Sequence, residues 1–223
     1  MSAPKPVVLC ILDGWGLSEV PEGNAPLLAK TPNFDRIMQA GPSAQLITHG
    51  PDVGLPRGQM GNSEVGHTNI GAGRVVAMDL GQIDLAIEEG SFAENARLRA
   101  FIAKLQETGG TAHLMGVVSD GGVHGHLSHM IAAARALDAA GVPVVIHAVT
   151  DGRDVAPSSA LGYSAALEEA LPEGVRIVTV TGRYFALDRD NRWDRVGKAS
   201  AAILRGEGGS APNARAAVQS AYD

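Results

Sequence analysis

The feature that most constrains the fold is a regular alternation of apolar and amphipathic segments in the second half of the chain. The apolar, β-branched runs predict strands at 111–118, 143–149 and 175–180. The amphipathic segments that follow them predict helices at 127–140, 158–170 and 192–204. Alternation of this kind is typical of βαβ units, whose right-handed crossovers build a mostly parallel sheet. We therefore expect an α/β fold.

A polar loop follows each of the three expected strands. The loops are Ser119–His124, Thr150–Asp154 and Thr181–Tyr184. Because parallel strands end at the same edge of a sheet, the loops should meet at the edge where open α/β sheets bind ligands. An Asp-Gly pair by itself is common turn chemistry. The prediction of a site that gathers a histidine, arginines and aspartates therefore depends on the shared position of the loops.

Four arginines fall within 13 residues after the third strand, at 183, 189, 192 and 195. Guanidinium groups bind phosphate and carboxylate oxygens through paired hydrogen bonds, so the cluster indicates a small phosphorylated acid as ligand. Aspartates at 188, 190 and 194 are interleaved, which leaves a solvated, salt-bridged surface as the alternative. The net charge of −6 and the lack of an aromatic-rich basic surface argue against a nucleic-acid partner.

A glycine-rich stretch at 58–71 carries a serine, a glutamate, a histidine and two asparagines but few apolar residues. Glycine permits sharp turns and close backbone approach, so we expect a tight loop that presents Ser63 as a nucleophile. A surface loop in which Ser63 caps a helix is the alternative. The Gly-x-Ser-x-Gly elbow is excluded, because Val65 stands where that motif requires its second glycine.

The N-terminal part begins with a continuous apolar run, Val7–Leu12, which is typical of a strand buried on both faces. Asp13 follows this run, at the position where such sheets place ligand-binding groups. An Asp-Gly turn is the alternative for Asp13. Further along, the sequence predicts a strand at 44–48 and helices that begin at Thr31-Pro32, at 79 and at 91.

Histidines at 124, 126 and 129 raise the alternative of a zinc site. Their spacing instead favours His124 alone in the crevice, with the other two capping or flanking the helix that follows. We expect structural roles for the remaining histidines, at 49, 67, 113 and 147.

Length and composition bound the remaining possibilities. The chain has 223 residues, enough for one large domain or two small ones, and its single cysteine excludes an internal disulfide. The N-terminus lacks the pattern of a signal peptide, and the longest apolar run is too short to cross a bilayer. We expect a cytoplasmic, soluble protein without a membrane partner.

Six motifs, taken together and in this order, closely resemble the 2,3-bisphosphoglycerate-independent phosphoglycerate mutases. They are Leu12–Gly16, Met60–His67, Ser119–His124, Thr150–Asp154, Gly182–Tyr184 and Asp188–Asp190. The resemblance implies an alkaline-phosphatase-like metal domain with an inserted α/β phosphotransferase domain. Residues 1–76 would be the first part of the metal domain, and residues 77–223 would belong to the insert, which would be incomplete at its C-terminal end.

The resemblance also implies a reaction, the interconversion of 3-phosphoglycerate and 2-phosphoglycerate in glycolysis. Ser63 would accept the phosphoryl group, and Asp13 and Ser63 would be ligands of one of two Mn²⁺ ions. The implied substrate-binding residues are His124, Arg153, Asp154, Arg183 and Arg189. Metal coordination activates a serine hydroxyl, and paired cations stabilise in-line phosphoryl transfer. A monomer is implied, with phosphoglycerate as its small-molecule partner.

The chain departs from this family in length, because family members are more than twice as long and most of their manganese ligands have no counterpart here. We therefore expect this polypeptide to be a fragment that is inactive by itself. Two alternatives stay open at this point. One is a related metal-dependent phosphohydrolase or phosphopentomutase-like enzyme. The other is a non-catalytic module that binds phosphorylated acids through its arginine loops.

Overall fold

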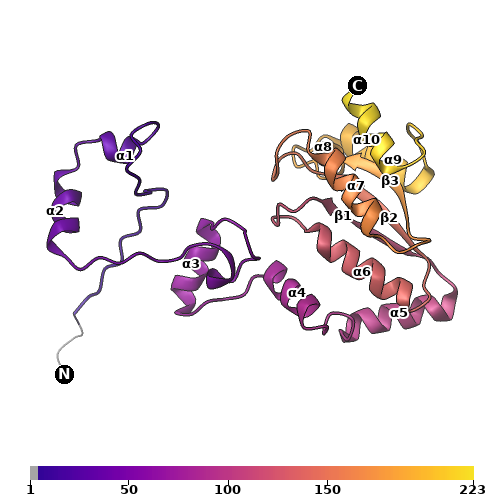
Figure 1. Ribbon diagram of the computed structural model, residues 1–223, viewed down its shortest axis with the longest axis horizontal. Coiled ribbons are helices and arrows are strands. Elements are labelled where there is room, and N and C mark those ends of the chain that lie inside the picture. The colour runs from indigo at the N-terminus through magenta and orange to yellow at the C-terminus, as the bar shows by residue number, and fades with distance from the viewer. Residues whose placement is uncertain (1–4) are drawn as a thin grey trace.

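A parallel three-stranded sheet forms the centre of the C-terminal part in the computed structural model, which describes residues 5–223 (Figure 1). The strands are β1 (Ala112–Val118), β2 (Val144–Thr150) and β3 (Arg176–Gly182), in the order β1-β2-β3. Both strand pairs are parallel, which confirms the α/β prediction. The register shifts at Ile146/His147, where β3 carries one extra residue.

Helices α6 (Leu127–Ala139) and α7 (Ala160–Ala170) connect the strands and contribute to the core. Ile146 of β2 is fully buried, and it shares a cluster with Val118, Met130 and Leu167. A second cluster surrounds Leu137 at the other end of the sheet. Both helices and all three strands lie within two residues of the ranges that the sequence predicted, because each element buries its apolar face within this chain.

Two helices follow β3 and the short α8 (Arg183–Ala186). The predicted α9 spans Trp193–Arg205, and α10 spans Ala214–Tyr222. The sequence analysis did not predict α10. This helix docks on α7 through two hydrogen bonds: the amide of Ala160 donates to the Tyr222 hydroxyl (3.1 Å), and the amide of Ala214 donates to the Glu168 carboxylate (2.6 Å).

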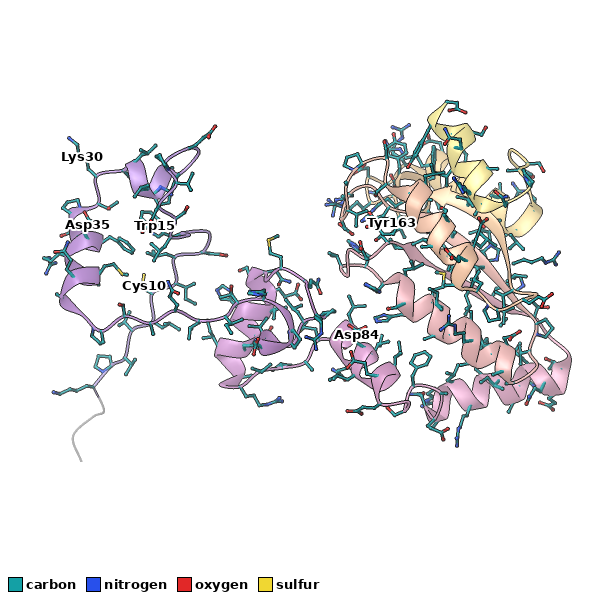
Figure 2. All side chains as sticks on the ribbon, viewed as in Figure 1. Cys10, Trp15, Lys30, Asp35, Asp84 and Tyr163 are labelled. Atoms are coloured by element: carbon teal, nitrogen blue, oxygen red, sulfur yellow. The ribbon has the colours of Figure 1, made fainter. Side chains whose placement is uncertain are left out.

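Helices α4 (Asp79–Glu88) and α5 (Ala96–Thr108) precede the sheet. The second begins five residues later than expected, because Asn95 is its N-cap and accepts hydrogen bonds from the amides of Arg97 and Leu98. Asp84 of α4 lies on the side that faces the sheet (Figure 2), where its carboxylate is 2.7 Å from His129 Nε2 of α6. This contact ties α4 to the C-terminal part.

The N-terminal part contains short helices separated by extended chain (Figure 1). They are α1 (Ala25–Leu28), α2 (Pro32–Ala40), the 3₁₀ turn η1 (Gly50–Val53) and α3 (Ser63–Ala72). The proline-initiated helix after Thr31 is confirmed. No helix within residues 5–223 combines the length and apolarity needed to cross a membrane.

The prediction of a buried strand at Val7–Leu12 is wrong, and so is that of a strand at 44–48. Both segments are extended but unpaired, and Val7 is 96% exposed. A strand is stable only when neighbours satisfy its backbone N–H and C=O groups. Within residues 5–223, no segment pairs with either run. The apolar segment Val7–Leu12 therefore has no sheet in the described chain to join.

The prediction of a loop throughout 58–71 also needs correction, because α3 begins at Ser63. Asn62 is the N-cap, and its side chain accepts a hydrogen bond from the amide of Val65 (2.9 Å). The loop prediction therefore applies only up to Asn62. The serine is the first helical residue and not the cap.

Candidate active site

Ser63 and Asp13, which are 50 positions apart in sequence, meet at the start of α3. The Ser63 hydroxyl donates a hydrogen bond to the Asp13 carboxylate, with 2.8 Å between Oγ and Oδ2. His67, one helical turn further along, places its Nδ1 3.1 Å from Ser63 Oγ and 2.8 Å from the Ser63 carbonyl oxygen. All three side chains are exposed. The hydroxyl is therefore held by a carboxylate and remains accessible to a ligand.

The backbone before Ser63 is fixed by a close approach at Gly61. A Cβ atom at this position would lie 1.8 Å from the carbonyl oxygen of Thr48, so only glycine fits. The adjacent cap at Asn62 then sets the direction of α3. These two neighbours explain why a glycine-rich sequence can place one hydroxyl at a defined point.

The three loops that follow β1, β2 and β3 meet around the guanidinium group of Arg183. Its Nη1 lies 2.8 Å from Asp151 Oδ1 and 2.6 Å from Asp154 Oδ2. His124 joins the group, with its Nδ1 2.6 Å from Asp154 Oδ2 and 3.4 Å from Arg183 Nη2. The convergence that the sequence predicted for His124, Asp154 and Arg183 is therefore present in the structure.

Asp151 organises these loops, and the sequence analysis did not select it. Its carboxylate accepts hydrogen bonds from the amides of residues 152–154 and from the Ser119 hydroxyl. Burial opposes ionisation, but the hydrogen bonds from Ser119, Arg183 and the backbone outweigh it and hold the Asp151 pKa far below its usual range. The Asp-Gly turn was the available signal, since such aspartates bind amides two residues on.

Asp154 and Tyr163, near the same edge of the sheet, also have shifted pKa values. Desolvation opposes ionisation of Asp154, yet hydrogen bonds from Arg183 and His124 lower its pKa. The Tyr163 hydroxyl donates to Asp120, and this bond raises the pKa of Tyr163 to about 12. Figure 2 shows Tyr163 beside the sheet. Asp154 is therefore a carboxylate at neutral pH and Tyr163 a neutral hydrogen-bond donor.

A cavity of about 380 Å³ opens beside Arg183 and is lined by the cationic side chains of Arg153, Arg183, Arg189 and Arg195. Arg153 and Arg189 form no ion pair with any residue in 5–223. Arg192 and Arg195 do: the first binds Asp194, and the second binds Asp188 and Asp190. The salt-bridged alternative is therefore right for these last two, whereas Arg153 and Arg189 remain available to an anion.

A larger cavity, of about 1200 Å³, lies between Ser63 and the loop edge of the sheet. Ser63 and its neighbours line one side, and Asp120–Val123 and Asp154 line the other. Gln59 crosses between the two sides, because its Nε2 donates to the Gly122 carbonyl oxygen (2.6 Å). The structure thus places the expected nucleophile and the expected ligand-binding loops around one space, although no hydrogen bond joins them directly.

The histidines do not form the zinc site considered as an alternative. His126 is the N-cap of α6 and accepts from the amide of Ser128 (3.2 Å), while His129 pairs with Asp84. Across residues 5–223, no three His, Cys, Asp or Glu side chains cluster as metal ligands. The expectation that His124 alone faces the crevice is not met, because His126 lines the larger cavity, whereas His124 contacts Asp154 and Arg183 and lines neither cavity.

Asp13 and Ser63 fit a divalent cation only as part of its ligand set. Their oxygens are close enough to share one ion, and carboxylate and hydroxyl oxygens suit hard divalent metals. Hard cations take about six oxygen ligands, however, and no group of three His, Cys, Asp or Glu side chains in residues 5–223 could complete such a set.

The fold and this pairing of an aspartate with a serine define the class of protein. Residues 5–147 match the model of the metalloenzyme superfamily, and residues 83–223 match a model described as "BPG-independent PGAM N-terminus". This chain belongs to the family of 2,3-bisphosphoglycerate-independent phosphoglycerate mutases.

Named relatives agree with this assignment. The 2,3-bisphosphoglycerate-independent phosphoglycerate mutases of Roseobacter denitrificans and Paracoccus denitrificans are 75% and 70% identical over 222 residues. A solved phosphoglycerate mutase from Leishmania mexicana, determined at low cobalt concentration, matches 86% of this chain with a TM-score of 0.70 and 32% identity, and 37% of that protein is covered. The chain spans 44% of the length of the two bacterial relatives.

Proposed function

We propose that this chain carries the nucleophile and the first substrate-binding loops of an enzyme that interconverts 3-phosphoglycerate and 2-phosphoglycerate. The observation that carries the proposal is the shared cavity of about 1200 Å³, which has Ser63 on one side and Asp154 on the other. In this proposal Ser63 is phosphorylated in the first half-reaction and returns the phosphoryl group in the second. The working compartment is the cytoplasm, and the working form is a monomer.

The substrate-binding role belongs to His124, Arg153, Asp154, Arg183 and Arg189. Arg153 and Arg189 lack carboxylate partners in the described chain, and both line the smaller cavity, so they suit the phosphate and carboxylate of the substrate. Asp154 is ionised and can accept a hydrogen bond from a glycerate hydroxyl. Arg183 is already neutralised by Asp151 and Asp154, so its main part is to hold the loops in register.

Ser63 must lose its proton when it attacks phosphorus. Asp13 and Ser63 are the residues here that would hold a divalent ion, with Mn²⁺ as the proposed metal, and such an ion would lower the pKa of the hydroxyl and stabilise phosphoryl charge. The hydrogen bond to Asp13 points the hydroxyl at a fixed position. The remaining ligands would come from outside residues 5–223, so we expect no turnover by this chain alone.

The division of the chain proposed here follows the two sides of the larger cavity. Residues 1–76 are the proposed first part of the metal domain, and residues 77–223 the proposed substrate domain. Transfer between the two sides requires exclusion of water, because phosphoserine would otherwise be hydrolysed. Gln59 bonds Gly122 across the cavity, and the Met78 amide bonds the Gly54 carbonyl oxygen across the same boundary. In this proposal these contacts still allow the two sides to move closer together.

A chimera tests the proposed function. Residues 1–223 of this chain would be joined to the remaining part of the Roseobacter denitrificans relative, which is 75% identical over the shared region. We expect interconversion of the two phosphoglycerates and a phosphoserine at position 63 by mass spectrometry after acid quench. Ser63→Ala should remove both, with a loss on the order of 10⁶-fold, the size seen when a catalytic nucleophile is deleted.

Two outcomes would contradict the proposal. One is a folded chimera without activity when the intact relative is active. The other is faster turnover of pentose 1- or 5-phosphates than of phosphoglycerates, which would favour a phosphopentomutase instead.

A further inference from the structure

We propose that Asp188 and Arg195 form a positioning pair that holds Arg189 at the smaller cavity and so helps to set affinity for the phosphorylated acid. The inference rests on the proposed function, because it takes Arg189 as a substrate ligand. Neither member of the pair was selected from the sequence as a site residue. Both lie outside the group centred on Arg183.

The first support is the way in which Asp188 orders the turn around Arg189. The Asp188 side chain is 2% exposed, and its Oδ2 accepts from the amides of Asp190 (3.2 Å) and Arg192 (2.9 Å). Asn191, between these two amides, has a φ of 58°, a left-handed conformation that asparagine tolerates better than most residues. The Asp188 carboxylate therefore closes a tight turn, and Arg189 is the residue that directly follows Asp188 in this turn.

The second support is the fit of Arg195 against this turn. Its Nη1 lies 2.9 Å from Asp188 Oδ1 and 3.1 Å from Asp190 Oδ2, and its guanidinium carbon lies 3.9 Å from the centre of the Tyr184 ring. The Arg195 side chain is only 14% exposed. A planar group that stacks on one residue and bridges two carboxylates is held in a single orientation.

The third support is the contrast with Arg189 itself. Arg189 is exposed, lines the cavity and pairs with no carboxylate among the described residues, although aspartates stand on either side of it in sequence. Arg195 occupies both of those carboxylates. By engaging Asp188 and Asp190, Arg195 leaves the neighbouring guanidinium of Arg189 free for an anionic ligand.

A substitution at Asp188 separates positioning from simple electrostatics, because the two predict opposite signs. Asp188→Asn removes a negative charge from the rim of an anion site, so a purely electrostatic role predicts tighter binding of 3-phosphoglycerate. A positioning role predicts weaker binding, on the order of tenfold, the lower end of what indirect ligand-orienting partners contribute. Isothermal titration calorimetry of the 223-residue chain would measure the change.

Three further variants make the test specific. Arg189→Gln should weaken binding at least as much, and adding Asp188→Asn to it should have no further effect. Arg192→Gln is the matched control for Arg189→Gln. It removes the same positive charge three residues further along, from a side chain that is paired with Asp194. Arg195→Lys keeps the charge but loses the ring stacking and should also weaken binding, which covers the case in which Asp188→Asn does not fold.

A ligand-free measurement completes the experiment. Hydrogen exchange at the amides of Asp190 and Arg192 should accelerate in Asp188→Asn and in Arg195→Lys. Equal or tighter binding by Asp188→Asn would overturn the positioning role, and so would an undiminished effect of that change in the Arg189→Gln background. If the wild-type chain bound no 3-phosphoglycerate at millimolar concentration, the proposed substrate site would fail, and this inference with it.

Discussion

Asp151 accepts hydrogen bonds from the amides of residues 152–154, from Ser119 and from Arg183, although its side chain is only 2% exposed. A buried carboxylate is tolerated only when such partners compensate for the lost hydration. The same residue therefore stabilises the loop and fixes where Arg183 points. Its effect on ligand binding is indirect, through the loop that carries Arg153 and Asp154.

We predict that Asp151→Asn lowers the free energy of unfolding by about 1–3 kcal/mol, because the neutral amide loses the ion pair with Arg183 and puts an N–H donor where a carboxylate oxygen accepted. Urea denaturation followed by circular dichroism would measure the loss. Asp138→Asn on the exposed side of α6 is the control and should change the free energy by less than about 0.5 kcal/mol. Equal effects of the two substitutions would contradict the central role of Asp151.

The pH dependence of this loss follows from the direction of the pKa shift. The Asp151 pKa is lower in the folded state than in the unfolded chain, so its stabilisation is fully present above about pH 4. It is lost as the pH falls from there toward the folded-state pKa. The difference between wild type and Asp151→Asn should therefore narrow between pH 5 and the most acidic conditions in which the protein stays folded. A constant difference would argue against a carboxylate effect.

His147 is a second buried titratable residue, on β2 between its neighbouring strands. Its Nε2 lies 2.9 Å from Nδ1 of His113 on β1, and its Nδ1 lies 2.8 Å from the Thr179 hydroxyl on β3. Burial, and then the neighbouring histidine, lower the pKa of His147. The folded state therefore favours the neutral imidazole.

We predict that this histidine makes the protein less stable in mild acid. The unfolded chain binds a proton near pH 6.5, whereas folded His147 resists protonation, so stability falls as the pH drops below 6.5 toward the lower folded-state value. His147→Gln should flatten the free energy of unfolding between pH 7 and 5.5. The same change at exposed His49 is the control and should leave the slope as in wild type.

At the scale of elements, the sequence predicted what the chain can bury by itself. The segments at 111–204 were placed to within two residues because their apolar faces meet inside this polypeptide. Val7–Leu12 has an equally clear strand pattern, but it has no neighbour in the described chain and stays extended. Helix α10 was missed although its segment is amphipathic and Asn213 is a good N-cap, and it is held by contacts to α7.

The candidate site divides in the same way. The meeting of His124, Asp154 and Arg183 followed from the expected parallel direction of the strands, which places the loops after them at one edge of the sheet. Which arginines are paired with a carboxylate could not be predicted from the sequence. Aspartates occur throughout 188–194, and which arginine each of them binds depends on the geometry of the turn. Nor did the sequence indicate which side chain would cap α3, since Asn62 and Ser63 are both good caps.

We predict that the Asn62 cap controls the first turn of α3 and hence the position of Ser63. Asn62→Ala should destabilise that turn by about 1 kcal/mol, because the amide of Val65 loses its acceptor. Faster hydrogen exchange at the Val65 amide would report the change. Asn62→Ser, which supplies another good capping side chain, should restore most of the protection. Similar exchange in all three proteins would show that the cap is unimportant.

At the scale of the whole molecule, stability is unevenly distributed along the chain. The largest fully buried side chains all lie at 118–167. Residues 5–48 are exposed apart from a few half-buried side chains, and Lys30 projects from this part well away from the sheet (Figure 2). Segments with few buried contacts open at low free-energy cost.

We predict that trypsin cleaves this chain in two stages. Cleavage after Lys30 and Arg57 should precede cleavage after Arg135 and Arg176, because the latter lie in a helix and a strand of the sheet domain. Mass spectrometry of a time course would identify the order, and digestion in denaturing urea should equalise the rates. Early cuts within the sheet domain would contradict this distribution of stability.

The strand order β1-β2-β3 has a consequence for how the polypeptide is made. Each new strand pairs with the one completed just before it, so the sheet can grow in step with the ribosome and never waits for a later strand. Val7–Leu12 emerges before these strands and pairs with no segment among the described residues 5–223. While the sheet forms, the apolar side chains of this run therefore stay exposed to solvent.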